Sequence, residues 1–204
     1  MRYVALGDSY TIGTSVAEDE RWPNQLADRI DEIELVANLG VDGATTADLL
    51  DRQLPDLAEL RPDLVSVLIG VNDVVQAVAD ADYERNVARI LGELAEQVPP
   101  HRIVAVAVPD YTVTPRGADF GDPVQQSDAI LRCNAILREA CEQRAIRFVP
   151  EIFEISRAAP GRPEMLAPDG LHPSGLQYAR WVDAIEPAVR GVLGSPGRTV
   201  AERA

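Results

Sequence analysis

The sequence predicts an α/β fold in which helices cover both faces of a parallel sheet, giving a three-layer α/β/α sandwich. Three observations carry this prediction. Short apolar runs alternate with longer helical stretches, the runs show no polar alternation, and 204 residues suit one domain with a sizeable core. Runs of Val, Leu, Ile and Ala without alternation are typical of strands buried on both faces. Alternating strands and helices indicate a doubly wound sheet.

The expected elements follow one another in regular order. Strands are predicted at residues 2–6, 35–38, 64–69, 103–108 and 147–149. Helices are predicted at residues 22–33, 46–60, 83–97, 124–144 and 175–193. Ser174, followed three residues later by Gln177, is a capping-box pattern for the last helix. We expect one domain over residues 1–194 and a flexible tail over residues 195–204.

The charged residues exclude several classes of function. The net charge of −14 argues against nucleic acid and against anionic membrane as partners, because both are held by clustered cations. All 19 basic residues are arginine. Without lysine the chain cannot form a Walker phosphate loop, a pyridoxal Schiff base or a Ser-Lys dyad.

The cysteines and the hydropathy indicate where the protein works. Cys133 and Cys141 are eight residues apart in a predicted helix, about 12 Å along its axis, which is too far for a disulfide. They fit a reducing compartment. Two histidines and two separated cysteines disfavour a zinc site, so we expect no metal and no organic cofactor. No apolar run approaches ~18 residues and no signal-peptide pattern is visible, so we expect a cytoplasmic protein without a membrane span.

Polar residues and glycines follow the predicted strands at their carboxyl ends, where open α/β sheets bind ligands. Ser9 comes directly off the first strand, Gly40 follows the second and Asn72 follows the third. His172, one of only two histidines, lies three residues after Asp169. A hydroxyl, a histidine and a carboxylate are the parts of a nucleophilic hydrolase. The Gly40 backbone and the Asn72 amide are plausible donors to an oxyanion.

Each of these residues taken alone also has a structural interpretation. Ser9 alone would be a helix N-cap, and so would Asn72 with Asp73. His172 alone would be a satisfied structural histidine. The glycines after the second strand would be ordinary turn residues: Gly40 and Gly43.

Other serines and the second histidine fit the chemistry less well. Ser15 lies in Gly13-Thr14-Ser15-Val16-Ala17, a near match to a nucleophile elbow, but it does not directly follow a strand. Ser66 lies inside a predicted buried strand, and His101 precedes a strand, at the wrong end of the sheet, so we expect it on the surface. Residues 109–123 break the rhythm after the fourth strand, and we expect this loop to border the substrate.

Four short motifs occur together, in order, between residues 7 and 173. They are Gly7-Asp8-Ser9-Tyr10, Asn38-Leu39-Gly40-Val41-Asp42-Gly43, Gly70-Val71-Asn72-Asp73 and Asp169-Gly170-Leu171-His172-Pro173. In this combination the chain resembles the SGNH hydrolases, also called GDSL esterases and lipases. One departure is visible, because Tyr10 stands where the family has its name-giving leucine.

The resemblance implies a flavodoxin-like five-stranded parallel sheet and a serine esterase or acylhydrolase that needs no cofactor. Ser9 would be the nucleophile, His172 the general base and then acid, and Asp169 the residue that orients the imidazole. The backbone N–H groups of Ser9 and Gly40 and the side chain of Asn72 would form the oxyanion hole. The expected partner is a small-molecule ester, and the polar loop without an amphipathic lid favours a short acyl chain.

Three other interpretations remain open. A phosphatase of the haloacid dehalogenase type would use Asp8 as its nucleophile and Asn72-Asp73 at its metal site, although Tyr10 replaces the second aspartate that such a site needs. A non-catalytic α/β binding module would use the same crevice without turnover. An acyltransferase would pass the acyl group to an acceptor other than water. The sequence leaves the oligomeric state open.

Overall fold

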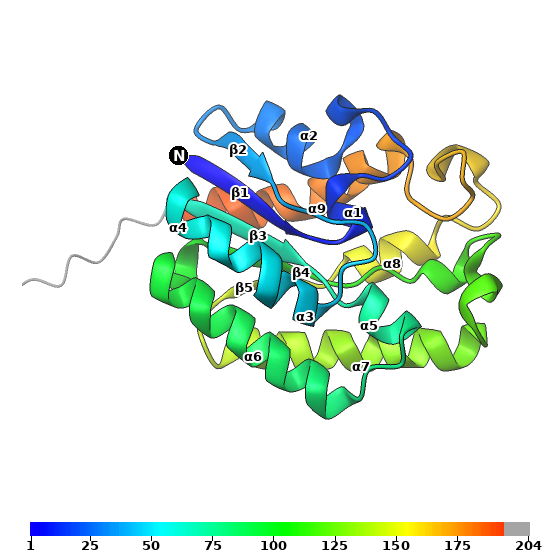
Figure 1. Ribbon diagram of the computed structural model, residues 1–204. Helices are drawn as coiled ribbons and strands as arrows, with labels where there is room; N and C mark the ends of the chain where they lie inside the picture. The colour runs from blue at the N-terminus through cyan, green and yellow to red at the C-terminus, as the bar shows by residue number, and fades with distance from the viewer. Residues whose placement is uncertain (194–204) are drawn as a thin grey trace, which may run out of the picture.

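Five parallel strands form the central sheet of the computed structural model, which describes residues 1–193. The strands are β1 (Arg2–Gly7), β2 (Glu34–Asn38), β3 (Leu64–Leu68), β4 (Ile103–Val106) and β5 (Arg147–Val149). Their order across the sheet is β2-β1-β3-β4-β5, and every neighbouring pair is parallel (Figure 1). This order is the flavodoxin-like one, with its switch point between β1 and β3, so the predicted fold class is confirmed.

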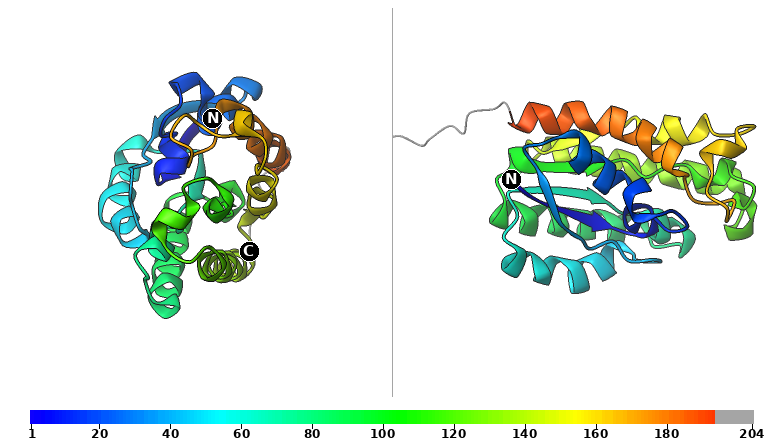
Figure 2. Two further views of the ribbon diagram at one scale, coloured as in Figure 1. Left: turned by 90° about the vertical axis from the view of Figure 1, so that its right-hand side faces the viewer. Right: turned by 90° about the horizontal axis from the view of Figure 1, so that it is seen from above.

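Helices cover both faces of the sheet (Figures 1 and 2). One face carries α2 (Trp22–Arg29), α8 (Ile152–Arg157) and α9 (Gly175–Leu193). The other carries α3 (Thr46–Asp48), α4 (Leu57–Leu60), α6 (Asp80–Gln97) and α7 (Pro123–Glu142). Two short helices, α1 (Ser9–Ile12) and α5 (Val71–Val75), directly follow β1 and β3.

The pleat of the strands divides the core into two clusters. In β1, Tyr3 and Ala5 pack with α2 and α9, whereas Val4 and Leu6 pack with the helices of the opposite face. All four side chains are fully buried. Successive strand residues point to opposite faces, so a strand covered on both sides has no place for polar alternation. This burial explains why the apolar runs predicted the strands correctly.

The helix predicted at residues 46–60 is broken. After α3 the chain forms a π-helical turn (Leu49–Gln53), a 3-10 turn (Leu54–Asp56) and then α4. Pro55 has no N–H and its ring crowds the preceding turn, so one regular helix cannot run through it. The helix predicted at residues 22–33 ends at Arg29, because Ile30 adopts an extended conformation and a short turn leads to β2.

The remaining element ends differ from the predictions by up to three residues, and α9 matches its predicted bounds. Its capping box is only half formed. Ser174 Oγ accepts the Gln177 N–H at 3.3 Å, but the Ser174 N–H donates to the Met165 carbonyl instead of to Gln177. None of the helices within residues 1–193 has the length and apolarity needed to cross a membrane. The predicted tail at residues 195–204 lies outside the described residues.

Candidate active site

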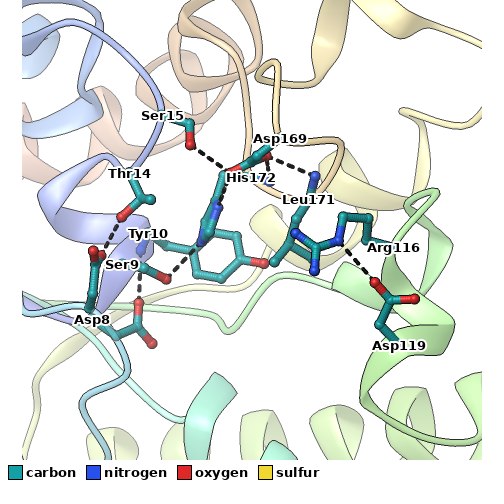
Figure 3. Close-up of polar contacts among 11 residues, drawn as sticks. Asp8, Ser9, Tyr10, Thr14, Ser15, Arg116, Asp119, Asp169, Leu171 and His172 are labelled. Carbon is teal, nitrogen blue, oxygen red and sulfur yellow. Dashed lines mark hydrogen bonds and ion pairs between the residues drawn. The ribbon is translucent and has the colours of Figure 1, made fainter.

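Ser9, His172 and Asp169 lie in one hydrogen-bonded line at the carboxyl edge of the sheet (Figure 3). Ser9 Oγ is 2.9 Å from His172 Nε2, and His172 Nδ1 is 2.6 Å from Asp169 Oδ2. Ser9 and His172 are 163 positions apart in the sequence. The fold therefore brings together a hydroxyl, an imidazole and a carboxylate in the geometry of a nucleophile with its base and the group that orients the base.

Ser9 owes its position to the turn that joins β1 to α1. Asp8 is the N-cap of α1, and its carboxylate accepts the Tyr10 N–H at 3.0 Å. Ser9 is therefore the first residue of the helix, and the interpretation of Ser9 as a cap is wrong. The end of β1 is held by Gln53, whose side-chain amide bonds both the N–H and the carbonyl of Gly7, at 2.9 and 2.8 Å.

Asp169 and His172 sit on a loop that largely holds itself together. Leu166 and Pro173 form an isolated antiparallel bridge across its base. Asp169 Oδ1 accepts the N–H groups of Leu171 and His172, each at 2.9 Å. Partial burial opposes the charge of this carboxyl, but the hydrogen bonds from His172, Ser15 and the backbone outweigh it and hold the pKa of Asp169 well below its ordinary value. The carboxylate is thus charged when it faces the imidazole.

Of the three predicted oxyanion donors, Ser9 and Asn72 line one cavity and Gly40 does not, and their N–H groups are not equally free. The Ser9 N–H has no acceptor among the hydrogen bonds of the described residues. Asn72 Nδ2 donates to the Ala44 carbonyl at 2.9 Å, which leaves its second N–H available. The Gly40 N–H donates to Asn38 Oδ1 at 3.1 Å. Gly40 packs so tightly on the α1 backbone that a Cβ would lie 2.5 Å from the Ile12 nitrogen, so only glycine fits there.

A small cavity of about 290 Å³ opens at Ser9 and His172. Its walls are mostly apolar, with a polar edge. The apolar and aromatic lining residues are Tyr10, Val71, Val75, Tyr111, Phe120 and Leu171. The polar edge is formed by Thr14, Asp42 and Asn72. Tyr10 also packs beneath the imidazole, with its ring centroid 5.1 Å from that of His172.

The loop predicted to border the substrate lines the cavity beside Ser9. Residues 109–123 contain two 3-10 turns, Tyr111–Val113 and Gly117–Phe120, and each supplies one aromatic wall of the cavity. The start of the loop is anchored by buried Asp110, which accepts hydrogen bonds from the hydroxyls of Thr112 at 2.6 Å and Ser127 at 2.8 Å. The cavity wall on this side is therefore fixed to α7.

The structure places the other sequence candidates outside the reacting line. His101 is exposed in a 3-10 turn before β4, as predicted. Ser66 is buried in β3 and bonds the Tyr3 hydroxyl at 2.7 Å. Asp73 is not the cap of its own helix, because its carboxylate bonds the N–H and hydroxyl of Thr46, at 2.9 and 2.5 Å, at the start of α3.

Asp8 is unsuited to the role that a phosphatase would give it. Its side chain is fully buried, and burial, together with nearby Asp73 and Asp42, raises the pKa of its carboxyl to about 8 against the effect of the Tyr10 N–H. A carboxyl that holds its proton at neutral pH is a poor nucleophile. Asp8 does not line the cavity, whereas Ser9 does.

Three contacts at the site were not predicted from the sequence. Ser15 Oγ donates to Asp169 Oδ2 at 2.7 Å (Figure 3). Thr14 Oγ1 donates to Asp42. Asn38, whose oxygen accepts the Gly40 N–H, also donates to the Thr11 carbonyl at 2.7 Å. The motif around Asn38 and Gly40 gave the position of this residue but no indication of the bridge that it forms to α1.

A known protein family matches this chain. A family model described as GDSL-like lipase/acylhydrolase matches residues 5–180. The chain belongs to this family. The match includes all four motifs, and the resemblance drawn from them is confirmed. Membership of the GDSL-like lipase/acylhydrolase family makes ester hydrolysis the activity of the chain.

Individual relatives of this GDSL-like protein are distant in sequence. It is 25% identical over 176 residues to an arylesterase from Vibrio mimicus, covering 84% of this chain and 80% of the relative. Its structure is similar to that of a lipase/acylhydrolase from Enterococcus faecalis, with a TM-score of 0.73, 22% identity, and coverage of 94% and 96%. It is also similar to an acetyl xylan esterase variant from Geobacillus stearothermophilus, with a TM-score of 0.71, 19% identity, and coverage of 99% and 97%. At these identities the two structures support the fold.

Proposed function

We propose that this GDSL-like protein is a serine esterase that cleaves short-acyl esters of small alcohols through an acyl-enzyme intermediate. The observation that carries the proposal is the line from Ser9 through His172 to Asp169, at 2.9 and 2.6 Å, beside a cavity that Ser9 and His172 line. We further propose a reducing compartment such as the cytoplasm, which the two free, buried cysteines support.

The proposed reaction has two halves. Ser9 Oγ attacks the ester carbonyl while His172 Nε2 takes the hydroxyl proton, and the imidazolium formed is stabilised by charged Asp169. The tetrahedral oxyanion accepts hydrogen bonds from the Ser9 N–H and from the free N–H of the Asn72 amide. The Gly40 N–H is a third donor, which the oxyanion shares with Asn38 Oδ1. Collapse breaks the C–O bond, and His172 gives its proton to the leaving alcohol. Water then attacks the acyl carbonyl while His172 takes its proton. Collapse breaks the bond to Ser9 Oγ, His172 returns the proton to that oxygen, and the carboxylic acid leaves.

The acyl side of the cavity limits the substrate. The cavity of about 290 Å³, lined by Tyr111, Phe120 and neighbouring aliphatic side chains, holds a short acyl group, whereas a long chain would extend beyond it into solvent. Asp42 at the polar edge favours a neutral or hydroxylated alcohol over an anionic one, because the protein already carries a net charge of −14.

A p-nitrophenyl ester series from acetate to decanoate tests the proposal. We expect kcat/KM to be highest for acetate to butyrate and to fall steeply beyond them, because each further methylene must leave the cavity. Steady-state hydrolysis measured by p-nitrophenol release gives this profile. No turnover of any ester would favour the non-catalytic binding module. A release burst that is followed by faster turnover with added alcohols would favour acyl transfer.

Asn72→Ala tests the oxyanion assignment. Its proposed donor acts only in the transition state, so kcat should fall roughly 10²–10³-fold with little change in KM. The substitution also breaks the bond to the Ala44 carbonyl, at a cost of about 0.5–1.5 kcal/mol in stability. Thermal unfolding and ester kinetics on the same preparation separate the two effects.

Asn86→Ala is the matched control for Asn72. Its amide donates to Thr46 Oγ1 at 3.0 Å, outside the cavity. The control should lose a similar amount of stability and keep its kcat. If Asn72→Ala instead unfolds at a lower temperature with unchanged kcat, Asn72 has no place in the oxyanion hole.

A further inference from the structure

The carboxylate of Asp169 has one hydrogen-bond donor from outside its own loop. Within residues 1–193 this carboxylate accepts four hydrogen bonds. Three of them come from its own loop, namely two from backbone N–H groups and one from His172 Nδ1. The fourth is the hydroxyl of Ser15, 2.7 Å from Oδ2, the oxygen that also faces the imidazole (Figure 3). Ser15 is 154 positions away in the sequence and only six after Ser9. It therefore joins the segment of the nucleophile to the loop of the acid.

The backbone at Ser15 gives no reason for a serine. Its φ of 68° lies in the left-handed region, where glycine is favoured and most side chains are disfavoured. The residue is exposed, so core packing does not require it either. The hydroxyl is the one feature of this side chain that makes a specific contact.

The neighbouring residue reaches the other side of the site. Thr14 donates to Asp42, which lies two residues after Gly40 in the turn that carries a proposed oxyanion donor. Gly13 ends α1 in a left-handed conformation, and its N–H donates to the Ser9 carbonyl at 3.0 Å. The Thr14-Ser15 pair thus leaves the nucleophile's own helix and contacts both flanking loops.

We propose that Ser15 is a positioning residue for the esterase reaction, holding the Asp169 carboxylate so that its Oδ2 faces His172 Nδ1 while His172 Nε2 faces Ser9. This inference rests on the proposed function. Without the hydroxyl, the carboxylate is fixed only within its own loop, and the loop can shift relative to Ser9 as a unit. The same bond contributes to the low pKa of Asp169, because it stabilises the charged form.

Two substitutions at Ser15 separate the hydroxyl from the backbone. Ser15→Ala removes the hydroxyl and keeps a side chain in the left-handed region, whereas Ser15→Gly removes the hydroxyl and relieves the backbone. We expect both to lower kcat by about 10- to 100-fold with KM within about twofold, since misplacing a catalytic group by about 1 Å can cost up to about 10²-fold. The rate at which a fluorophosphonate labels Ser9 should fall by a similar factor. Ser15→Gly should unfold at or above the temperature of Ser15→Ala.

Ser66→Ala is the control, because it removes another serine hydrogen bond of 2.7 Å, to the Tyr3 hydroxyl, at a position outside the cavity lining. Its kcat should be unchanged. Wild-type kcat in both Ser15→Ala and Ser15→Gly would overturn the proposal. So would a loss of kcat in Ser15→Ala that is absent in Ser15→Gly, or a change that affects KM alone. Ser9→Ala, measured in parallel, distinguishes a failure of this inference from a failure of the proposed function. If that variant is inactive while both Ser15 variants are normal, only this inference fails, whereas an active Ser9→Ala variant removes the proposed function itself.

Discussion

Replacing Ser9 with alanine is expected to lower kcat by about 10⁶-fold while the protein stays folded. The change removes the attacking oxygen, and no other hydroxyl lies within hydrogen-bond distance of His172 Nε2 among the described residues. The fold should tolerate it, because α1 is capped by Asp8 and not by Ser9. Hydrolysis of p-nitrophenyl acetate gives the rate, and circular dichroism with thermal unfolding gives the fold.

Labelling by a fluorophosphonate supplies the positive control for Ser9. The wild-type protein should carry one label, which mass spectrometry should locate on Ser9. Ser15 is the sharpest alternative, because it is exposed, lies six residues away and bonds Asp169, the aspartate that contacts His172. A label on Ser15, or near-normal turnover by folded Ser9→Ala protein, would contradict the assignment of the nucleophile.

His172→Ala should cause a loss of the same order, roughly 10⁵–10⁶-fold in kcat, because the base and the nucleophile act as one unit. The second histidine makes a clean comparison. His101 is exposed at the opposite end of the sheet, so His101→Ala should change kcat by less than about twofold. Ester kinetics of both variants at one pH test the pair. Equal losses in the two variants would be incompatible with this site.

The direction in which kcat/KM of the wild-type enzyme changes with pH follows from the proposed roles of Asp169 and His172. The pKa of Asp169 is held well below its ordinary value, so this carboxylate stays charged throughout the working range of pH. Activity then depends on the neutral form of His172, which alone can accept the Ser9 proton. We expect kcat/KM to rise with pH, because a general base must be unprotonated to accept the Ser9 proton. A rate that falls with rising pH between pH 5 and 8 would contradict a histidine base.

The strands and the reacting residues were predictable because each depends on short-range sequence information. The run from Tyr3 to Leu6 is apolar at every position, which only a strand covered on both faces requires. In a parallel sheet the residues after such strands meet at one edge, so the positions of Ser9 and Asn72 followed from the topology. His172 and Asp169 were found because their spacing of three residues belongs to a motif.

The contacts that the sequence did not reveal depend on partners far away in the chain. Asp73 bonds Thr46, 27 residues earlier, so its local resemblance to a helix cap was misleading. Ser15 bonds Asp169 from a left-handed turn, and no local pattern of side chains distinguishes that serine from a surface residue. The prediction of one helix over residues 46–60 was wrong for another reason. Its apolar spacing was helical, but Pro55 decides where the backbone hydrogen bonds can run.

The wide separation of Ser9 and His172 along the chain has a consequence for assembly. The proposed reacting residues and oxyanion donors extend from residue 9 to residue 172, and four of the five strands lie between these two positions. Closing a contact of this span comes late when a chain folds, because the loop entropy must first be offset by the intervening pairings. No fragment that stops before His172 contains the whole set. Catalytic turnover is therefore a property of the completed sheet, and a rate measurement on this enzyme counts only the molecules that have finished folding.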